Sequence, residues 1–453
     1  MTRPQNGDLS SLKQPFFNRN DDARVPGEAI VKLTPEATSQ IREHIPDISI
    51  ADSIGARCLG IAEVDLTLQE IGVRSISHLH SPSPPVWNGQ GWVEPDTTFY
   101  YAVRFDPKRQ ADAIALLSHT TGIVLAESNY WREGAAANPS RTQEAPEQWG
   151  LERIGCPAAW KYTEGDPDVV IAVIDSGVDL HHRALYQQLA SGRNFVAFDK
   201  FPTVPHGLRL SGNYTNPTTP PWDEHGHGTH VAGKISCARV RGSSPTGVTL
   251  NCTILPVRAF ARAHDWRNNQ PTSWGDDKAI TAGIDWAVTH GARIINMSFS
   301  NIAPLSEAQK NAIDYAIRSD VVVITSAGNG GDGWPMQPAA TPGVIAVGAT
   351  DSNNQPANFS SRGDHVKIWA PGVDIWSTHW GRSTYASMPG TSIAAAHVSG
   401  VAALLFSLKL NLTASDVRRL LLETTTPITS GSADPDITGG LVNAEKALRK
   451  AAE

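Results

Sequence analysis

The sequence has 453 residues, of which 40% are hydrophobic and 18% charged, and its formal net charge is −7. This length predicts two or three domains with ample core, and the acidic balance gives no sign of a basic patch large enough to suggest nucleic acid binding. We expect no apolar run near the roughly 18 residues that span a membrane. Neither nucleic acid nor a membrane is therefore an expected partner. We expect the protein to be a monomer.

Residues 1–25 are polar, lack hydrophobic periodicity and are predicted to be flexible. No apolar segment of a secretory signal peptide is visible there, which favours a cytoplasmic protein, one exported by another route, or a chain without its leader. The cysteines form no CxxC pair and no metal-binding spacing, so free buried thiols are expected, although Cys237 and Cys252 could approach each other; the four are Cys58, Cys156, Cys237 and Cys252.

Residues 26–132 predict a small α+β domain. The alternation of apolar and polar residues indicates strands and helices in the order β-α-β-β-α-β, which is that of a split βαβ unit. The strands are expected at 29–33, 73–79, 99–105 and 123–131, and the helices at 35–44 and 107–118. Residues 133–147 are small, polar and interrupted by prolines, so they are predicted to be an exposed linker that proteases can reach.

From residue 148 onward the pattern changes to continuous β-branched runs separated by helical segments. Such runs are typical of strands buried on both faces of a parallel sheet, and their alternation with helices predicts an α/β domain over 148–453. The strands are expected at 169–174, 253–257, 294–297, 321–325 and 344–347, and the helices at 229–238, 277–290, 306–319, 392–408 and 413–424. Functional sites in such sheets gather at the carboxyl ends of the strands.

Two side chains at element ends have more than one interpretation. Asp175 directly follows the first buried strand, where a carboxylate can simply cap the next turn. Ser392 follows Gly390-Thr391 at the start of a helix of small residues, where a serine commonly acts as the cap. The free N–H groups and the positive dipole end at that helix start would equally stabilise an oxyanion.

His227 lies in a histidine-rich and glycine-rich segment just before a predicted helix. Neighbouring side chains could make this segment a metal cluster, namely Asp223, Glu224, His225 and His230. The spacing does not match a recognised zinc signature such as His-Glu-x-x-His. We therefore expect no metal here and consider His227 as a possible base.

Two further segments could contact a reacting or extended ligand. Asn329 follows Ser326-Ala327-Gly328 and is either a turn residue or an amide donor directed at a carbonyl. Ser298, Phe299 and Ser300 end another strand and could offer backbone groups to an extended chain.

Together these residues match the needs of one chemistry. A serine hydroxyl requires a base to remove its proton, a carboxylate to orient that base, and donors for the oxyanion. The chain supplies one candidate for each in the order Asp175, His227, Asn329, Ser392, and Asp…His…Ser is the chain order of subtilisin.

The motifs around these residues resemble those of the subtilisin-like serine proteases, the subtilase family. They are Val173-Ile-Asp175-Ser-Gly-Val-Asp179, His227-Gly-Thr-His-Val-Ala-Gly233, Ile295-Asn-Met-Ser298, Ser326-Ala-Gly-Asn329 and Gly390-Thr-Ser392-Ile-Ala394. The resemblance covers about residues 148–447, and residues 26–132 resemble the family's propeptide more loosely. It implies a three-layer domain with a mainly parallel central sheet, preceded by a small α+β ferredoxin-like propeptide domain.

The resemblance also implies roles for individual residues. Ser392 would be the nucleophile, His227 the general base and acid, and Asp175 the orienting carboxylate. The Asn329 side chain and the Ser392 backbone N–H would form the oxyanion hole. The remaining candidates would bind substrate, with Ser298, Phe299 and Ser300 pairing with its backbone and Ser326, Ala327 and Gly328 forming the wall of the pocket for the residue before the cut.

The implied function is a serine endopeptidase that is made as a zymogen and cleaves extended protein or peptide substrates. Its propeptide would act as an intramolecular inhibitor and be cut off within 133–147. No cofactor is required for the chemistry, and structural calcium is possible but unsupported, because 236–250 lacks an Asn/Asp-rich loop.

Departures from the family pattern leave two alternatives open. Ala396 stands where the family usually has proline, which should relieve crowding near the nucleophile and could favour amines over water, as in a transpeptidase or ligase. A pseudoprotease that only binds peptides through 298–300 is the other alternative. Ile393 replaces a common methionine and removes a thioether that oxidation would alter.

Overall fold

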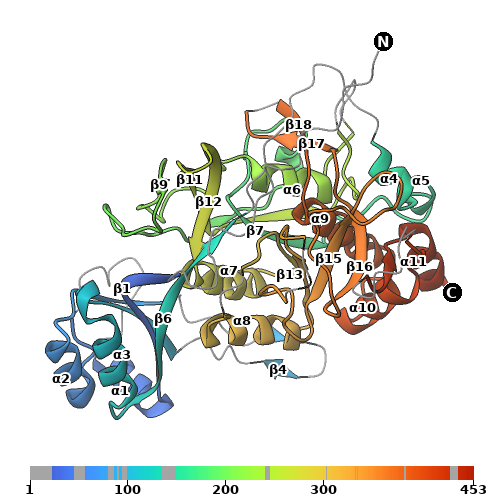
Figure 1. Cartoon of the computed structure of the whole chain (residues 1–453). Coiled ribbons are helices and arrows are strands. Elements are labelled where there is room, and N and C mark those ends of the chain that lie inside the picture. Colours follow the sequence, from blue (N-terminus) through green and yellow to red (C-terminus); the bar gives the residue numbers. More distant parts are fainter. Residues whose placement is uncertain are drawn as a thin grey trace.

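The computed structural model describes residues 23–44, 57–79, 86–88, 91–93, 99–134, 148–239, 245–301, 304–331, 333, 335–381, 384–428 and 437–453. Within them, two sheets organise the chain (Figure 1). Arg24 and Val25, expected in the flexible N-terminus, already belong to a strand. Most of the predicted linker, 135–147, lies outside the described residues.

The larger sheet is parallel throughout and has the order β19-β16-β15-β14-β13-β7-β10-β8. Each strand expected from residue 148 onward is present in it. The strands are β7 (Val170–Asp175), β8 (Arg193–Asn194), β10 (Thr253–Arg258), β13 (Ala292–Met297), β14 (Val322–Ser326), β15 (Ile345–Thr350), β16 (Val366–Pro371) and β19 (Gly440–Leu441).

Helices cover both faces of this sheet, which makes three layers. Along β7, Ile171 and Val173 pack into one core while Ala172 and Ile174 pack into the other, as the two-residue period of a strand requires. The first core contains α4 (Trp149–Arg153), α5 (Cys156–Ala159), α6 (His227–Ile235), α9 (Thr391–Leu408), α10 (Ala414–Glu423) and α11 (Ala444–Ala452). The second contains α7 (Asp277–Thr289) and α8 (Glu307–Arg318). The predicted three-layer α/β fold is confirmed.

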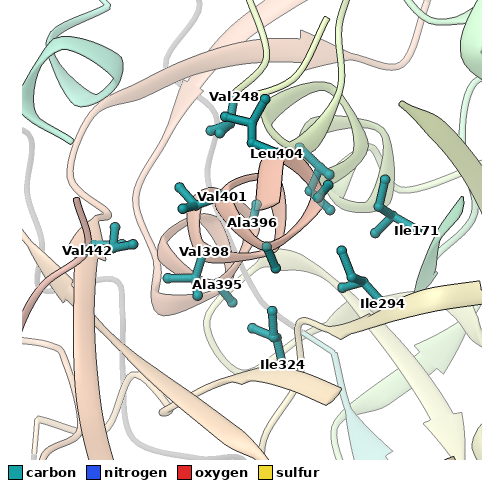
Figure 2. Close-up of a cluster of buried hydrophobic side chains, with 14 of the residues drawn as sticks. Ile171, Val248, Ile294, Ile324, Ala395, Ala396, Val398, Val401, Leu404 and Val442 are labelled. Carbon is teal, nitrogen blue, oxygen red and sulfur yellow. The ribbon is translucent and has the colours of Figure 1, made fainter. Parts of the chain in front are cut away.

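Helix α9 lies at the centre of the first core. Figure 2 shows its residues Ala395 and Ala396 on the side of Ile324 and Ile294 of the sheet, and Val398 and Val401 on the side of Val442. Our expectation of no apolar run near 18 residues was wrong, because α9 is long and apolar enough to cross a membrane by composition. The alanines, the serines and the glycine of α9 do not look like a long apolar run in the sequence. Since 89% of the helix is buried inside the protein, α9 is accounted for as a core helix.

The second sheet is antiparallel in its N-terminal part and has the order β2-β5-β1-β6-β12-β11-β9. Three helices cover one face of that part around a separate core, and on the other face Ile30 and Tyr100 pack with Ala308 of α8. The elements are β1 (Arg24–Leu33), α1 (Pro35–His44), α2 (Ala62–Glu70), β2 (Ser75–His78), β5 (Tyr100–Arg104), η3 (Pro107–Arg109), α3 (Gln110–Ser118) and β6 (Ile123–Glu133). This is the expected α+β arrangement with α2 added.

Several elements were not predicted. The most important is a hairpin of β11 (Phe260–Asp265) and β12 (Gln270–Asp276), which continues the second sheet because β12 pairs with the end of β6. Figure 1 shows β6 running from the N-terminal helices up to β12. Also not predicted were α2, α4, α5, α11, β8, β16 and β19, whose bounds are given above. The remaining unpredicted elements are β3 (Val86–Trp87), β4 (Trp92–Val93), η4 (Tyr186–Gln188), β9 (Leu208–Leu210), β17 (Ile375–His379) and β18 (Thr384–Met388).

The cysteines are unpaired, so the expectation of free thiols is confirmed. Cys156, Cys237 and Cys252 are buried as expected, but Cys58 is exposed, so the expectation of a buried thiol was wrong for that residue. Burial raises the pKa of both the Cys156 and the Cys237 thiol to about 12, so these thiols are neutral core side chains.

Candidate active site

Asp175 and His227 meet where β7 ends and α6 begins. The His227 Nδ1 atom lies 2.9 Å from both carboxylate oxygens of Asp175, and both side chains are buried. A proton on Nδ1 shared with this carboxylate leaves Nε2 free to accept another. Burial lowers the His227 pKa, but the Asp175 charge and its hydrogen bond outweigh burial and raise that pKa above its ordinary 6.5.

Asp223 holds this pair in place. Its carboxylate accepts hydrogen bonds from the Gly226 N–H (2.7 Å), the Thr229 N–H (2.9 Å) and the Ser176 hydroxyl (2.9 Å). These bonds tie the start of α6 to the end of β7. Burial opposes ionisation of Asp223, yet the bonds from Gly226 and Thr229 lower its pKa below the ordinary value.

The hydrogen bonds of Asp223 argue against the metal site that was considered from the sequence. The Asp223 oxygens that would bind a cation already accept five protein donors, because the His225 N–H and the Thr229 hydroxyl also bond to them. No group of three or more potential ligands that could hold a metal occurs among the described residues. The sequence analysis missed this role of Asp223 because the residue looks like part of a histidine cluster and because its partner Ser176 lies 47 residues earlier in the chain.

Ser392 lies in the first turn of α9, beside the end of β13. Its hydroxyl donates to the Ser298 carbonyl at 3.1 Å, and the Ser298 hydroxyl donates to the Ser392 carbonyl at 3.3 Å. His227 Nε2 has no hydrogen-bond partner among the described residues. The structure therefore shows the Asp175–His227 contact, whereas the Ser392 hydroxyl is bonded to Ser298, and a hydrogen bond from Ser392 to His227 stays a prediction. Such bonds are often formed only with substrate bound.

A buried chain of hydrogen bonds fixes Ser298. The Asn296 amide donates to the Ser298 hydroxyl at 2.8 Å, and the Ser399 hydroxyl donates to Asn296 Oδ1 at 2.9 Å. Asn296 and Ser399 were not singled out from the sequence. Only the packing of α9 against β13 brings them together, since they are 103 residues apart.

The Asn329 side chain is oriented toward the start of α9. Its Oδ1 accepts from the Thr391 N–H at 3.0 Å and from the Thr391 hydroxyl at 2.9 Å, so its Nδ2 is the end left to donate elsewhere. Gly390 has φ +148°, and a Cβ at this residue would stand 3.8 Å from Asn329 Nδ2. Glycine therefore keeps the space between the amide and Ser392 open.

The predicted wall of the pocket is anchored beside the same helix start. Ser326 ends β14, and the Gly328 N–H donates to the Thr391 hydroxyl at 3.2 Å. Ala327 is buried and donates its N–H to the Val347 carbonyl at 2.9 Å. The three residues thus lie next to Asn329, and their contact with substrate stays a prediction.

The Ser298–Ser300 segment already pairs with an extended chain. Gly134 bridges Phe299 in antiparallel fashion, and its N–H donates to the Ser273 carbonyl at 2.8 Å. The end of β6 thus passes between β12 and Phe299, two segments that can bind an extended peptide by β-augmentation.

The comparisons with known proteins agree with this geometry. Residues 166–444 match the model of the subtilase family. Subtilisin DY of Bacillus licheniformis is 35% identical over 287 residues (62% of this chain, 91% of that protein), and thermitase of Thermoactinomyces vulgaris is 34% identical over 302 residues (67% and 96%). The thermophilic serine proteinase of Bacillus sp. (strain AK1) is 35% identical over 294 residues, which are 65% of this chain and 66% of that protein.

The chain belongs to the subtilase family and is a subtilisin-like serine-type endopeptidase. Enzymes of this family need no cofactor for catalysis. The two alternatives, a transpeptidase or ligase and a peptide-binding pseudoprotease, are not favoured by the matched relatives.

Replacing Asn329 with alanine is expected to lower kcat by about 10²- to 10³-fold, the loss seen when an oxyanion donor of subtilisin is removed. KM should change little, because the amide would bind the developing oxyanion more strongly than the ground-state carbonyl. The exposed Asn353 offers a matched control, since Asn353→Ala removes the same amide from a distant turn. Steady-state kinetics on a peptide substrate provide the measurement, and a kcat within threefold of the unaltered enzyme would remove Asn329 from the oxyanion hole.

Proposed function

We propose that the protein is made as a zymogen and that its mature form hydrolyses extended polypeptides through an acyl-enzyme on Ser392. In this mechanism His227 Nε2 takes the Ser392 proton while Oγ attacks the substrate carbonyl. Asp175 keeps the His227 tautomer and stabilises the imidazolium that forms. The Asn329 amide and the Ser392 backbone N–H bind the oxyanion.

The later steps use the same groups in reverse. The His227 imidazolium gives its proton to the leaving amine, which departs and leaves the acyl group on Ser392. Water then enters, loses a proton to His227 and attacks the ester, which releases the carboxylic acid and restores the serine hydroxyl. Each proton is thereby returned, and no metal is required.

The observation that carries the zymogen proposal is the position of β6. Its end occupies the track between β12 and Phe299, where a substrate would have to lie. Residues 23–134 would therefore act as an intramolecular inhibitor, and substrate could bind only after they leave. A folded protein presents few extended segments of this kind, so unfolded or flexible chains are the expected substrates.

Charged contacts at the starts of α7 and α8 support the same proposal. Glu127 accepts hydrogen bonds from the N–H groups of Glu307 (3.0 Å) and Ala308 (3.1 Å), and Glu28 pairs with Lys278 at 3.0 Å. Carboxylates at helix starts are favoured by the helix dipole. The burial of Glu127 nevertheless raises its pKa to about 7, so removal of residues 23–134 would return this carboxylate to water.

Intact mass spectrometry of the purified chain during incubation tests the proposal. We expect a cut within 135–147 and, with it, increasing labelling of Ser392 by a fluorophosphonate probe as the groove opens. Peptide mapping identifies the labelled residue. A chain that keeps its full mass, digests no casein and carries no label on Ser392 would contradict the proposal.

A further inference from the structure

Arg132, near the end of β6, enters a buried acidic pocket of the later chain. Its Nε lies 2.5 Å from Asp277 Oδ1 and its Nη2 lies 2.8 Å from Asp277 Oδ2. Nη2 also donates to the Pro304 carbonyl at 2.8 Å. The Arg132 side chain is 2% exposed and that of Asp277 is 0% exposed. This is a two-pronged guanidinium–carboxylate pair with a third acceptor, a geometry that only arginine satisfies.

The strand register relates this pocket to the reacting serine. Arg132 lies opposite Gly275 of β12, and two residues later Gly134 lies opposite Phe299. In an antiparallel pair, a bound peptide that follows the same register would place its next residue opposite Ser298, whose carbonyl binds the Ser392 hydroxyl. A substrate on the same track would have its attacked carbonyl at that next position. The Arg132 position is then the fourth residue before the cleaved bond.

The charge of Asp277 makes this pocket selective. When residues 23–134 leave, the carboxylate loses its guanidinium partner, and a buried charge without a partner is costly. A substrate arginine restores both hydrogen bonds. A lysine restores the charge but not the two-pronged geometry, while leucine would cover Asp277 with an apolar side chain and glutamate would add a second negative charge.

The preceding residue of β6 fills a second pocket on the other side of the strand. Trp131 is 1% exposed and packs edge-on against Phe198, with ring centroids 4.9 Å apart. Trp274 and Ala261 of the β11–β12 hairpin belong to the same apolar cluster. Since successive side chains of a strand point to opposite faces, a chain on this track can use both pockets at once.

We infer that the mature enzyme selects extended substrates with arginine as the fourth residue before the cleaved bond, preceded by a large aromatic residue. The inference rests on the proposed function, because it takes β6 to mark the path of the substrate. It adds what that path recognises: Asp277 binds the arginine, and the cluster around Phe198 and Trp274 binds the aromatic ring.

A panel of internally quenched peptides tests the inference on the processed, unaltered enzyme. The peptides are identical except for arginine, lysine, leucine or glutamate at the fourth position before the cut. Hydrogen bonds to charged groups predict that kcat/KM falls about 10- to 100-fold from arginine to leucine, with lysine between them and glutamate lowest. In a second set, tryptophan replaced by alanine at the fifth position should also lower kcat/KM.

The same experiment separates the two proposals. If unfolded casein is digested but the leucine peptide is cleaved as well as the arginine peptide, the specificity inference is wrong and the proposed function stands. If neither casein nor any peptide is cleaved, the proposed function itself fails.

Variants of Asp277 provide an independent readout. Asp277→Asn should lower kcat/KM for the arginine peptide by at least about tenfold while changing the leucine peptide little, so the selectivity ratio collapses. Glu307→Gln is a matched control, because it removes the same charge from the first turn of the neighbouring helix α8, where the carboxylate contacts Lys310. An unchanged selectivity ratio in Asp277→Asn would overturn the inference. If that variant does not fold, the peptide panel on the unaltered enzyme still decides.

Discussion

Replacing Ser392 with alanine is expected to abolish cleavage within 135–147 and to lower kcat on peptide substrates by about 10⁶-fold, as in subtilisin without its nucleophile. In the proposed mechanism this hydroxyl is the attacking nucleophile, and no acyl-enzyme can form without it. The fold should persist, because Ser392 makes a single side-chain donation, to the Ser298 carbonyl. Intact mass and initial rates provide the measurements.

Ser407→Ala is the matched control for this variant. Ser407 lies on the same helix, and its hydroxyl donates to the Ala403 carbonyl at 2.7 Å, far from the start of α9. This control should process itself and retain its activity. Self-cleavage that continued in Ser392→Ala at the rate of the control would assign the nucleophile to another residue.

The local pattern of the sequence predicted most of the parallel sheet. Strands such as β7 and β10 consist mostly of apolar residues, because a strand that is buried on both faces has apolar side chains at successive positions. Short elements with mixed composition were missed. β11 contains the polar residues Arg262, His264 and Asp265. It is a strand because β12 and β9 pair with it on either side, and no local sequence pattern predicts such pairing.

The candidate site shows the same division. Motif order placed Asp175 beside His227, and their 2.9 Å contact agrees with that placement. Arg132 and Asp277 are 145 residues apart in the sequence, and they meet because β6 pairs with β12, directly before α7. For Ala396, the sequence predicted one property that the structure describes and one that it does not test. α9 runs unbroken through this residue, and its effect on the competition between water and amines stays a prediction.

Replacing Asp175 with asparagine is expected to lower kcat by about 10⁴-fold, as the equivalent change does in serine proteases with this triad. The amide has the size of the carboxylate but carries no charge, so it neither stabilises the His227 imidazolium nor fixes its tautomer. Asp364→Asn is a suitable control, because Asp364 is 99% exposed and pairs only weakly with Lys367 at 3.7 Å. That control should retain full activity.

The pH dependence gives this prediction a second, independent test. His227 acts as a base only when neutral, so kcat/KM of the unaltered enzyme should rise with pH through a His227 pKa that Asp175 holds above 6.5. In Asp175→Asn the Asp175 charge is gone, and burial, which lowers this pKa, becomes dominant. The rising limb should therefore move to lower pH while the plateau falls. A limb that stayed in place would show that Asp175 does not control the charge of His227, even if activity were lost.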